Sequence, residues 1–517
     1  MRSVQEPREP ATPPNARWLA RAALAAIGLS VALMMLVGLA GPSAAVPAVP
    51  RTRCWPPLYG HLALPGAGVT FLTWVVVLAG GAGLAAGLVA TARGWRPRPL
   101  NLIIGSVVAV VALALVPPIG STDLLDYAVY GRIAALGHSP YLMTPAQLRL
   151  TGDPIGAIAP VPWQHDPSVY GPLATATERA ASELGGTSAG LTLFWLKVWS
   201  ALAYLAIVAI LDRLLRADAG RRARAHLLWS VNPLMLLAVM AGGHVDGLAA
   251  AAGVAGLLAL RRLDVRSGLL AGVLVGAAVA VKAPFALFGL GLALAAYRSP
   301  RVLAALGAGA AAILVPSYLL IGGRPAVVAQ VQRGDAGVDL YEPWQLLYRA
   351  LHWNHPSQRA DLLGLAAAVL LAVLLLRRLP DGPPGLPAIR PSLALALAWL
   401  VASPQQRPWF DAMLFPLLAV MPATRLDWIA LGRAVAGGVA ELPGVTYYTL
   451  LRPNWLAQAD DAVARDLAPL ALLALCVALI WLCVTRRWLP GRGAGRPPPA
   501  GGPPSAKVTD LAPGRST

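Results

Sequence analysis

Long apolar segments separated by short polar turns are the feature that most constrains what this chain can fold into. Measured against a membrane span of about 20 apolar residues, the sequence gives roughly 14 such segments, some of which could cross a bilayer only if tilted or broken. Hydrophobic residues make up 57% of the 517 residues and charged residues only 13%, which is typical of a bilayer protein rather than of several soluble domains. We therefore expect an all-α, polytopic integral membrane protein with a bundle of about 12–14 transmembrane helices.

The arginines predict how this bundle is oriented. The formal net charge is +18, yet the basic residues form no stripe of the kind that binds nucleic acid, so we expect no nucleic-acid partner. They recur instead in alternate loops, at positions 93–98, 213–224, 261–266, 377–378 and 486–487. Because cytoplasmic loops carry an excess of Lys and Arg, we expect a multi-pass protein of the plasma membrane with both termini in the cytoplasm and the long loops outside.

Composition divides the chain into a membrane domain and two tails. Residues 1–16 and 490–517 are rich in Pro, Gly and charge and cannot bury a core, so we expect disordered cytoplasmic tails. Residues 17–489 are expected to form the membrane domain. Within it, residues 119–189 form the largest external loop, whose Pro, Gly and aromatic residues indicate an ordered surface rather than a flexible linker.

Acidic and aromatic residues open this external loop. If the segment after Ser121 is helical, Asp123, Asp126, Tyr127 and Tyr130 fall at i, i+3, i+4 and i+7 and share one face. Two neighbouring carboxylates raise the pKa of one of them, as partial burial does, which suits a group that must accept a proton. A helix N-terminus that favours acidic residues, beside an interfacial aromatic belt, would explain the same pattern.

Further candidate binding residues stand in the same loop and at breaks between apolar segments. Tyr141 and Tyr170 belong to loop 119–189; aromatic faces suit a carbohydrate, and an aromatic belt explains these residues equally well. His244 and Asp246 interrupt apolar sequence, and polar residues at such a break indicate a lined cavity. Their spacing of two suits a hydrogen-bonded turn better than a metal site, so we assign no metal ligands.

Three cationic side chains stand near apolar sequence. Lys197 and Lys282 could each bind an anion or extend to the membrane interface. Arg407, next to Trp409, could hold a phosphate through its fork of donors or could anchor a helix end.

The motifs follow one another in a characteristic order over residues 121 to 411. They are Ser121-x-Asp123, Tyr127 and Gly131, Gly137 to Tyr141, Tyr170-Gly171-Pro172, Gly243-His244-x-Asp246, Lys282, and Pro408-Trp409-Phe410. This order resembles that of the GT-C superfamily of polyprenyl-phosphate-sugar-dependent glycosyltransferases. Within it, the chain most resembles the actinobacterial α-(1→6)-mannosyltransferases of the MptA/MptB type, which elongate the mannan core of lipomannan.

The resemblance implies a GT-C-like bundle whose external loops carry the active site. It implies transfer of a mannosyl residue from polyprenyl-phosphate mannose to a growing lipoglycan or mannan of the cell envelope, with inversion and an α-(1→6) linkage. The position that matches the family's catalytic base is Asp123, and Asp126, which the pattern does not include, is a second catalytic candidate. Arg132, Lys282 and Arg407 are the candidate cations beside the leaving lipid phosphate. No cofactor and no divalent metal is expected, because the sugar arrives on its lipid.

Two other functions would suit the same architecture. A transporter or a flippase for lipid-linked sugars also needs many helices with broken segments. We would expect the acidic residues of such a carrier near mid-bilayer, whereas Asp123, Asp126, Asp246 and Asp411 are predicted at the external boundary. A non-catalytic partner in cell-envelope assembly would tolerate the loss of these acids.

Overall fold

The computed structural model describes most of the chain. The described residues are 13–50, 56–58, 60, 62–161, 163–327, 339, 341–352, 358–444 and 453–489. The predicted tails, 1–16 and 490–517, lie outside these ranges except for residues 13–16, where the first helix already begins at Pro14. That helix starts with proline, whose fixed φ suits the first turn and whose missing N–H removes no helical hydrogen bond.

Every regular element in the described ranges is a helix, as the sequence predicts. The first three are α1 (Pro14–Ala40), α2 (Gly66–Ala92) and α3 (Pro99–Ala114). Segment 119–189 contains α4 (Asp123–Ala135), α5 (Pro145–Leu150) and α6 (Pro172–Gly185). The central helices are α7 (Ala189–Leu214), α8 (Ala219–Ala225), α9 (Pro233–Met235), α10 (Asp246–Ala259), α11 (Val265–Val281), α12 (Ala286–Ala296) and α13 (Pro300–Ser317). The last are α15 (Pro343–Ala350), α16 (Gln358–Arg378), α17 (Ile389–Ala402), α18 (Phe415–Val420), α19 (Leu426–Glu441), α20 (Asn454–Ala462) and α21 (Ala468–Thr485).

Length and hydropathy identify a polytopic membrane protein. Over the described residues, six helical stretches are long and apolar enough to cross a membrane: Pro14–Ala40, Gly66–Ala92, Ala189–Leu214, Ala219–Ala241, Pro300–Val327 and Asn454–Thr485. A further six apolar helices have 10–17 residues. Such short helices agree with the expectation that part of the bundle consists of broken segments.

Small residues allow these helices to pack closely. Helices α11 and α13 lie against each other, and a Cβ atom added at Gly272 of α11 would collide with the carbonyl oxygen of Leu306 in α13. Conversely, a Cβ atom at Gly309 of α13 would collide with the carbonyl oxygen of Leu269. Close backbone approach at small residues is the usual means of helix association in lipid, where apolar burial provides little driving force.

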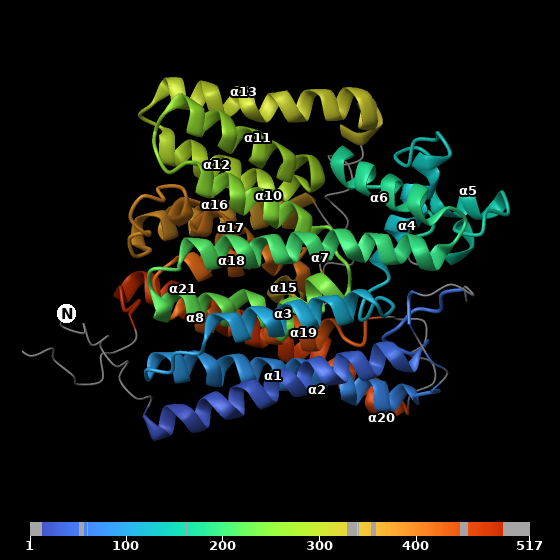
Figure 1. Cartoon of the computed structure of the whole chain (residues 1–517), viewed down its shortest axis with the longest axis horizontal. Coiled ribbons are helices and arrows are strands. Elements are labelled where there is room, and N and C mark those ends of the chain that lie inside the picture. The colour runs from blue at the N-terminus through green and yellow to red at the C-terminus, as the bar shows by residue number, and fades with distance from the viewer. Residues whose placement is uncertain are drawn as a thin grey trace, which may run out of the picture.

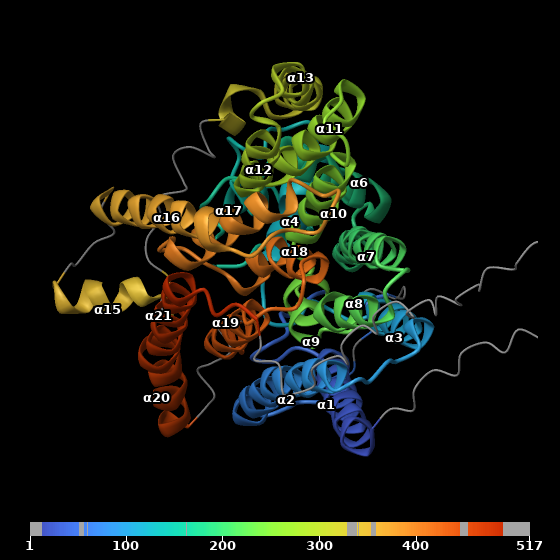
Figure 2. The same ribbon diagram turned by 90° about the vertical axis from the view of Figure 1, so that its left-hand side faces the viewer.

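The bundle has two different ends. Figure 1 shows the long helices running side by side, with α4, α5 and α6 gathered at the right-hand end. Helix α1 begins and α21 ends at the opposite end, where the turn between α7 and α8 also lies. Seen from that end in Figure 2, α1 and α2 form one edge of the bundle and α11 and α13 the other, with α10, α17 and α18 between them.

Lys197 stabilises the fold by binding backbone carbonyl groups. It is buried in α7, and its ammonium group donates hydrogen bonds to the carbonyl oxygens of Leu113, Val116 and Pro117 at 2.7, 2.8 and 3.1 Å. These carbonyls belong to the last turn of α3 and to the residues just after it, where a helix leaves acceptors unsatisfied. Its three donors are thereby used, and Lys197 is not available to bind an anion.

Candidate active site

The first turn of α4 leaves one acidic side chain partly exposed to solvent and buries another. The helix begins at Asp123, and the Asp123 amide donates a hydrogen bond to Oγ of Ser121 over 3.1 Å. The Asp123 side chain is 18% exposed, whereas Asp126 is 4% exposed and its Oδ1 has no hydrogen-bond partner among the described residues. Asp123 is therefore the acid that a substrate could reach.

The environment of Asp126 favours the protonated acid. Burial raises the pKa of Asp126 well above its usual value, and the nearby acids Asp123, Asp166 and Glu178 raise it further. Asp123 and Asp126 both lie on the first turn of α4, and Asp126 is the one whose surroundings favour the neutral form.

His244 lies beside Asp123 in the turn that leads into α10. Its Nδ1 donates a hydrogen bond to the carbonyl oxygen of Ala238, and its Nε2 lies 3.1 Å from Oγ of Ser121 and 3.6 Å from Oδ2 of Asp123. Burial lowers the pKa of His244, so the neutral ring carries its hydrogen on Nδ1. Nε2 then accepts a hydrogen bond from the Ser121 hydroxyl, which itself accepts one from the Asp123 amide.

An aromatic ring fixes the imidazole from the other half of the chain. Trp409 stacks on His244, with ring centroids 3.7 Å apart and an interplanar angle of 12°. Trp409 belongs to a 3-10 helix, Pro408–Met413, that lies far from α4 in sequence. The imidazole is thus held by this stacking and by its hydrogen-bond partners Ala238 and Ser121.

Asp246 and Lys282 form a second charged pair next to this turn. The Lys282 ammonium lies 2.8 and 2.7 Å from the two carboxylate oxygens of Asp246, which is buried. The ammonium also lies 4.1 Å from the ring centroid of Phe410 and 6.0 Å from that of Tyr170. The Lys282 ammonium is thus held between a carboxylate and two aromatic rings, and the lysine side chain is 13% exposed.

The break after α11 also anchors segment 119–189. The amide of Gly171 donates to the carbonyl oxygen of Val281 over 3.0 Å, one residue before Lys282. A Cβ atom at Gly171 would collide with the carbonyl oxygen of Ala280. Glycine at this position therefore lets the start of α6 touch the backbone of α11.

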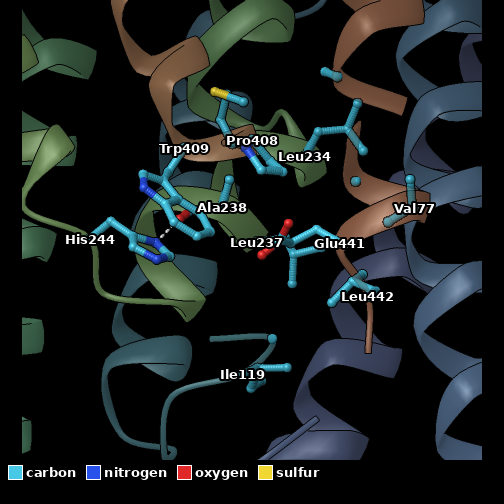
Figure 3. Close-up of a pocket in the computed structure, with 14 residues that line it drawn as sticks. Val77, Ile119, Leu234, Leu237, Ala238, His244, Pro408, Trp409, Glu441 and Leu442 are labelled. Atoms are coloured by element: carbon cyan, nitrogen blue, oxygen red, sulfur yellow. Dashed lines mark hydrogen bonds between the residues drawn. The ribbon is translucent and has the colours of Figure 1, made fainter. Parts of the chain in front are cut away.

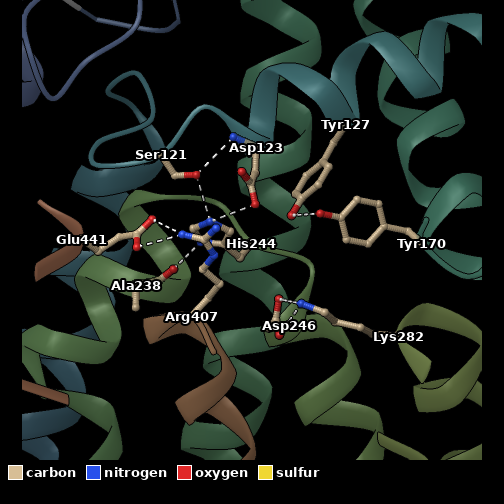
Figure 4. Close-up of polar contacts among 10 residues, drawn as sticks. All are labelled: Ser121, Asp123, Tyr127, Tyr170, Ala238, His244, Asp246, Lys282, Arg407 and Glu441. Carbon is tan, nitrogen blue, oxygen red and sulfur yellow. Dashed lines mark hydrogen bonds and ion pairs between the residues drawn. The ribbon is translucent and has the colours of Figure 1, made fainter. Parts of the chain in front are cut away.

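Arg407 supplies the other cation of the site. Its Nη1 lies 3.0 Å from both carboxylate oxygens of Glu441, and its Nη2 lies 3.0 Å from Oδ1 of Asp339. The arginine side chain is still 33% exposed. Figure 4 shows Asp123, His244, Arg407 and the Asp246–Lys282 pair converging from different elements.

A second ion network lies beneath the segment that carries Arg407. Nε of Arg433 in α19 lies 2.8 Å from Oδ1 of Asp411, and its Nη1 lies 3.9 Å from Oε1 of Glu342. All three side chains are buried. Breaking a buried ion pair strands a charge, so this network ties Pro408–Met413 to α19 and α15.

The remaining predicted residues divide into those near Asp123 and those away from it. The Tyr127 hydroxyl lies 3.3 Å from that of Tyr170, beside Asp123. Burial raises the pKa of both phenols, so both stay neutral donors. Tyr130 instead donates to the backbone oxygen of Asp166 over 2.8 Å.

Tyr141 and Arg132 have partners elsewhere in segment 119–189. The Tyr141 hydroxyl lies 2.8 Å from Oγ1 of Thr175. Nε of Arg132 lies 2.8 Å from Oδ2 of Asp153, and Arg132 is about half a turn around the helix from Asp123. In this structure Lys282 and Arg407, rather than Arg132, are the cations that accompany Asp123.

An apolar pocket opens beside these charges. The empty space in it, part of which is open to solvent, is about 440 Å³. Its lining residues are Val77, Ile119, Gly120, Leu234, Met235, Leu237, Ala238, His244, Pro408, Trp409, Ala434, Gly438, Glu441 and Leu442. Figure 3 shows the Glu441 carboxylate and the stacked His244 and Trp409 rings among apolar side chains. The site therefore combines a partly exposed acid, an arginine and an apolar pocket.

Sequence reasoning missed Glu441 and Asp339 as members of the site. Glu441 is the last residue of an apolar helix and Asp339 lies outside the helices of the described ranges, and neither belongs to a recognisable motif. The only signal was the position of both acids near the end of the bundle that carries Arg407.

Comparison with known proteins gives partial matches. A family model described as alpha-(1->6)-mannopyranosyltransferase, N-terminal domain, matches residues 25–298. An alpha-(1->6)-mannopyranosyltransferase of Mycobacterium tuberculosis is 28% identical over 153 residues, 29% of this chain and 26% of the relative. A probable alpha-(1->6)-mannopyranosyltransferase of Mycolicibacterium smegmatis is 29% identical over 161 residues, 31% of this chain and 29% of the relative. Each alignment thus spans less than a third of the relative's length. The family match includes Asp123, His244 and Lys282 and ends before Arg407.

Proposed function

Because the chain belongs to the alpha-(1->6)-mannopyranosyltransferase family, we propose that it is a membrane glycosyltransferase that uses a lipid-linked sugar. The donor is polyprenyl-phosphate mannose, and the acceptor is a growing lipoglycan or mannan of the cell envelope. The new bond is an α-(1→6) linkage formed with inversion. The observation that carries the proposal is the convergence of a partly exposed carboxylate, Asp123, with Arg407 at an apolar pocket.

The pocket and the arginine suit the two chemical parts of such a donor. The first isoprenoid unit would lie against the apolar wall of the pocket, which includes Val77, Leu237 and Leu442. Arg407 borders it through the adjacent Pro408 and through its partner Glu441. A guanidinium is well suited to hold a phosphate through paired hydrogen bonds. It would also stabilise the negative charge that develops on the leaving phosphate.

Asp123 is the proposed catalytic base. The acceptor hydroxyl would attack the anomeric carbon of the mannose while its proton passes to the Asp123 carboxylate. The new carbon–oxygen bond forms as the bond between the anomeric carbon and the phosphate oxygen breaks, and the lipid phosphate leaves with the electron pair. The hydrogen bonds from the Ser121 hydroxyl to His244 and from the Asp123 amide to Ser121 would fix the start of α4, and with it the position of the base.

The aromatic and charged residues next to Asp123 would bind the sugar. The phenol of Tyr170 and the ammonium of Lys282 lie close to one another and partly exposed, so they could contact hydroxyl groups of mannose. Trp409 would contribute indirectly, by holding His244 in place. The scheme uses no nucleotide and no divalent metal.

The proposed location is the plasma membrane, with the α4–α6 end of the bundle outside the cell and both termini in the cytoplasm. Support comes from the arginine-rich turns, such as that between α7 and α8, at the end of the bundle opposite to α4–α6. An excess of Arg in short loops marks the cytoplasmic side.

Mannose transfer by isolated membranes tests this function. Membranes containing the wild-type protein should transfer radiolabelled mannose from polyprenyl-phosphate mannose to an endogenous or added mannan acceptor. Membranes containing Asp123→Asn at the same level should not. Transfer by neither protein would support a transporter, a flippase or a non-catalytic partner in cell-envelope assembly. Equal transfer by both would remove Asp123 from its proposed role.

A further inference from the structure

In this structure the guanidinium of Arg407 is shared by two carboxylates. Glu441 contacts Nη1 through both oxygens at 3.0 Å, and Asp339 contacts Nη2 through Oδ1 at 3.0 Å. An incoming phosphate would therefore have to share or replace one of these partners. The choice between them depends on what else holds each carboxylate.

Asp339 is held in place independently of Arg407. Its Oδ2 accepts a hydrogen bond from the amide of Gln406 over 2.7 Å, and its own amide donates to the carbonyl oxygen of Pro404 over 3.0 Å. For Glu441, by contrast, Arg407 is the sole side-chain partner within the part of the chain that the structure describes. The Glu441 carboxyl also lines the apolar pocket, as Figure 3 shows. Glu441 is thus the more easily displaced of the two.

The charges around the site favour such a displacement. Two cations, Lys282 and Arg407, face four carboxyl groups, and Lys282 is already matched by both oxygens of Asp246. The other three carboxyl groups are those of Asp123, Asp339 and Glu441. The remaining titratable neighbours are His244, Tyr127, Tyr170 and Tyr341, which are neutral, and Arg433, which is paired with Asp411 and Glu342. Adding an anion without removing one would leave the arginine surrounded by excess negative charge.

We propose that Glu441 is a positioning residue for the lipid donor. In the free protein it occupies the edge of Arg407 that the donor phosphate takes, and on binding it gives up that edge and takes up a proton. The exchange replaces one anion on Arg407 by another and leaves the charge of the cluster unchanged. This inference rests on the proposed lipid-phosphate donor.

The chemistry of the Glu441 carboxyl supports uptake of a proton. Burial raises the pKa of Glu441, and the charges of Asp339 and Asp123 raise it further. Arg407 opposes this, through its charge and its hydrogen bonds, and lowers the pKa. Once the arginine turns to the phosphate, the influences that remain all favour the neutral acid.

Calorimetry on the full-length protein in detergent measures this coupling. The probe is farnesyl methyl phosphate, a phosphodiester that does not itself titrate near neutral pH, and farnesol is the uncharged control ligand. Titrations in buffers of different ionisation enthalpy should show uptake of about one proton per phosphodiester bound by the wild type. Glu441→Gln should bind the same probe about tenfold more tightly, since the competing charge is gone, with no proton uptake.

Asp339→Asn is the matched control, because it removes a carboxylate from the other side of Arg407 and leaves Glu441 in place. It should retain the proton uptake. If Glu441→Gln fails to fold, the wild type still decides the question. Proton uptake on binding requires the Kd of the phosphodiester to rise by up to about tenfold for each unit by which the pH is raised near neutrality. Binding with no dependence on buffer or pH would overturn this inference alone. Absence of phosphodiester binding by every folded variant would remove the proposed donor, and this inference with it.

Discussion

Oδ2 of Asp123 lies 3.6 Å from Nε2 of His244, and the hydroxyl of Ser121 connects that nitrogen to the Asp123 amide, 3.1 Å from each. Two separate segments thus fix the start of α4, which carries the acid. The contact between Asp123 and His244 is not an ion pair, because burial lowers the pKa of His244 and favours the neutral ring.

Removing the bridging hydroxyl should slow the reaction without unfolding the protein. Ser121→Ala leaves Nε2 of His244 and the Asp123 amide without their shared partner. We expect kcat to fall about tenfold while KM for the donor changes little, because the lost hydrogen bonds orient the base rather than the lipid. Ser106→Ala is the control, since the buried Ser106 hydroxyl has no partner among the described residues. A larger change in KM than in kcat would argue against an orienting role.

The two acids of α4 should respond differently to loss of charge. Asp123→Asn removes the proposed base and should lower kcat by about 10²–10⁴-fold. Asp126→Asn resembles the protonated acid that burial already favours, so it should retain most of the activity. Mannose transfer by matched amounts of the two variants measures this. A lower activity of Asp126→Asn than of Asp123→Asn would assign the role of base to Asp126 instead.

Glu178 should make stability depend on pH. It is fully buried in α6, and neither carboxyl oxygen has a partner within the described ranges. Burial raises the pKa of Glu178 from 4.5 to about 8. Between these values the folded state binds more protons than the unfolded state, so stability falls as pH rises, by at most about 1.4 kcal/mol per pH unit.

Glu178→Gln tests that dependence. The amide resembles the neutral acid, so the variant should melt at a higher temperature than the wild type near pH 8 and show little difference near pH 5. Thermal unfolding in detergent at several pH values measures the two curves. Parallel curves would show that Glu178 keeps an ordinary pKa in the folded protein.

Gly171→Ala should loosen the contact between α6 and α11. The added methyl group would collide with the carbonyl oxygen of Ala280 and strain the hydrogen bond from Gly171 to Val281. We expect a loss of about 1–3 kcal/mol in stability and reduced activity. Gly307→Ala, where the methyl group would meet no atom within 4 Å, should have no such effect. Thermal unfolding of both variants gives the comparison, and equal melting temperatures would contradict the proposed contact.

The Asp246–Lys282 pair should show strong coupling. Lys282→Met strands a buried carboxylate and should destabilise the protein by about 3–5 kcal/mol. Combining it with Asp246→Asn removes the stranded charge and should recover much of that loss. A double-mutant cycle from unfolding data measures the coupling. Additive losses would mean that the two side chains are independent in the membrane.

The helical, membrane-spanning architecture could be predicted because it depends on local properties of the sequence. Runs such as those of α2 and α21 are apolar all round and long enough to span a bilayer. The exact bounds could not be predicted where a helix breaks, since the Ala219–Ala241 stretch contains Pro233 and changes its hydrogen-bond pattern on both sides of it.

The site was predictable only where its residues are neighbours in sequence. The helical face of Asp123, Asp126 and Tyr127 follows from their spacing, and the structure contains that helix. The pairing of Arg132 with Asp153, and of Arg407 with Glu441, depends on how distant segments pack, which periodicity does not encode.

The stacking of His244 on Trp409 joins a part of the chain that the family model matches to a part that lies beyond the match. The exposed acid comes from the stretch that the family model matches, whereas the guanidinium comes from the stretch beyond it. Neither half contains both the proposed base and the proposed phosphate-binding arginine. If the two halves were produced as separate polypeptides, we expect mannose transfer only when they reassemble around that pair of rings.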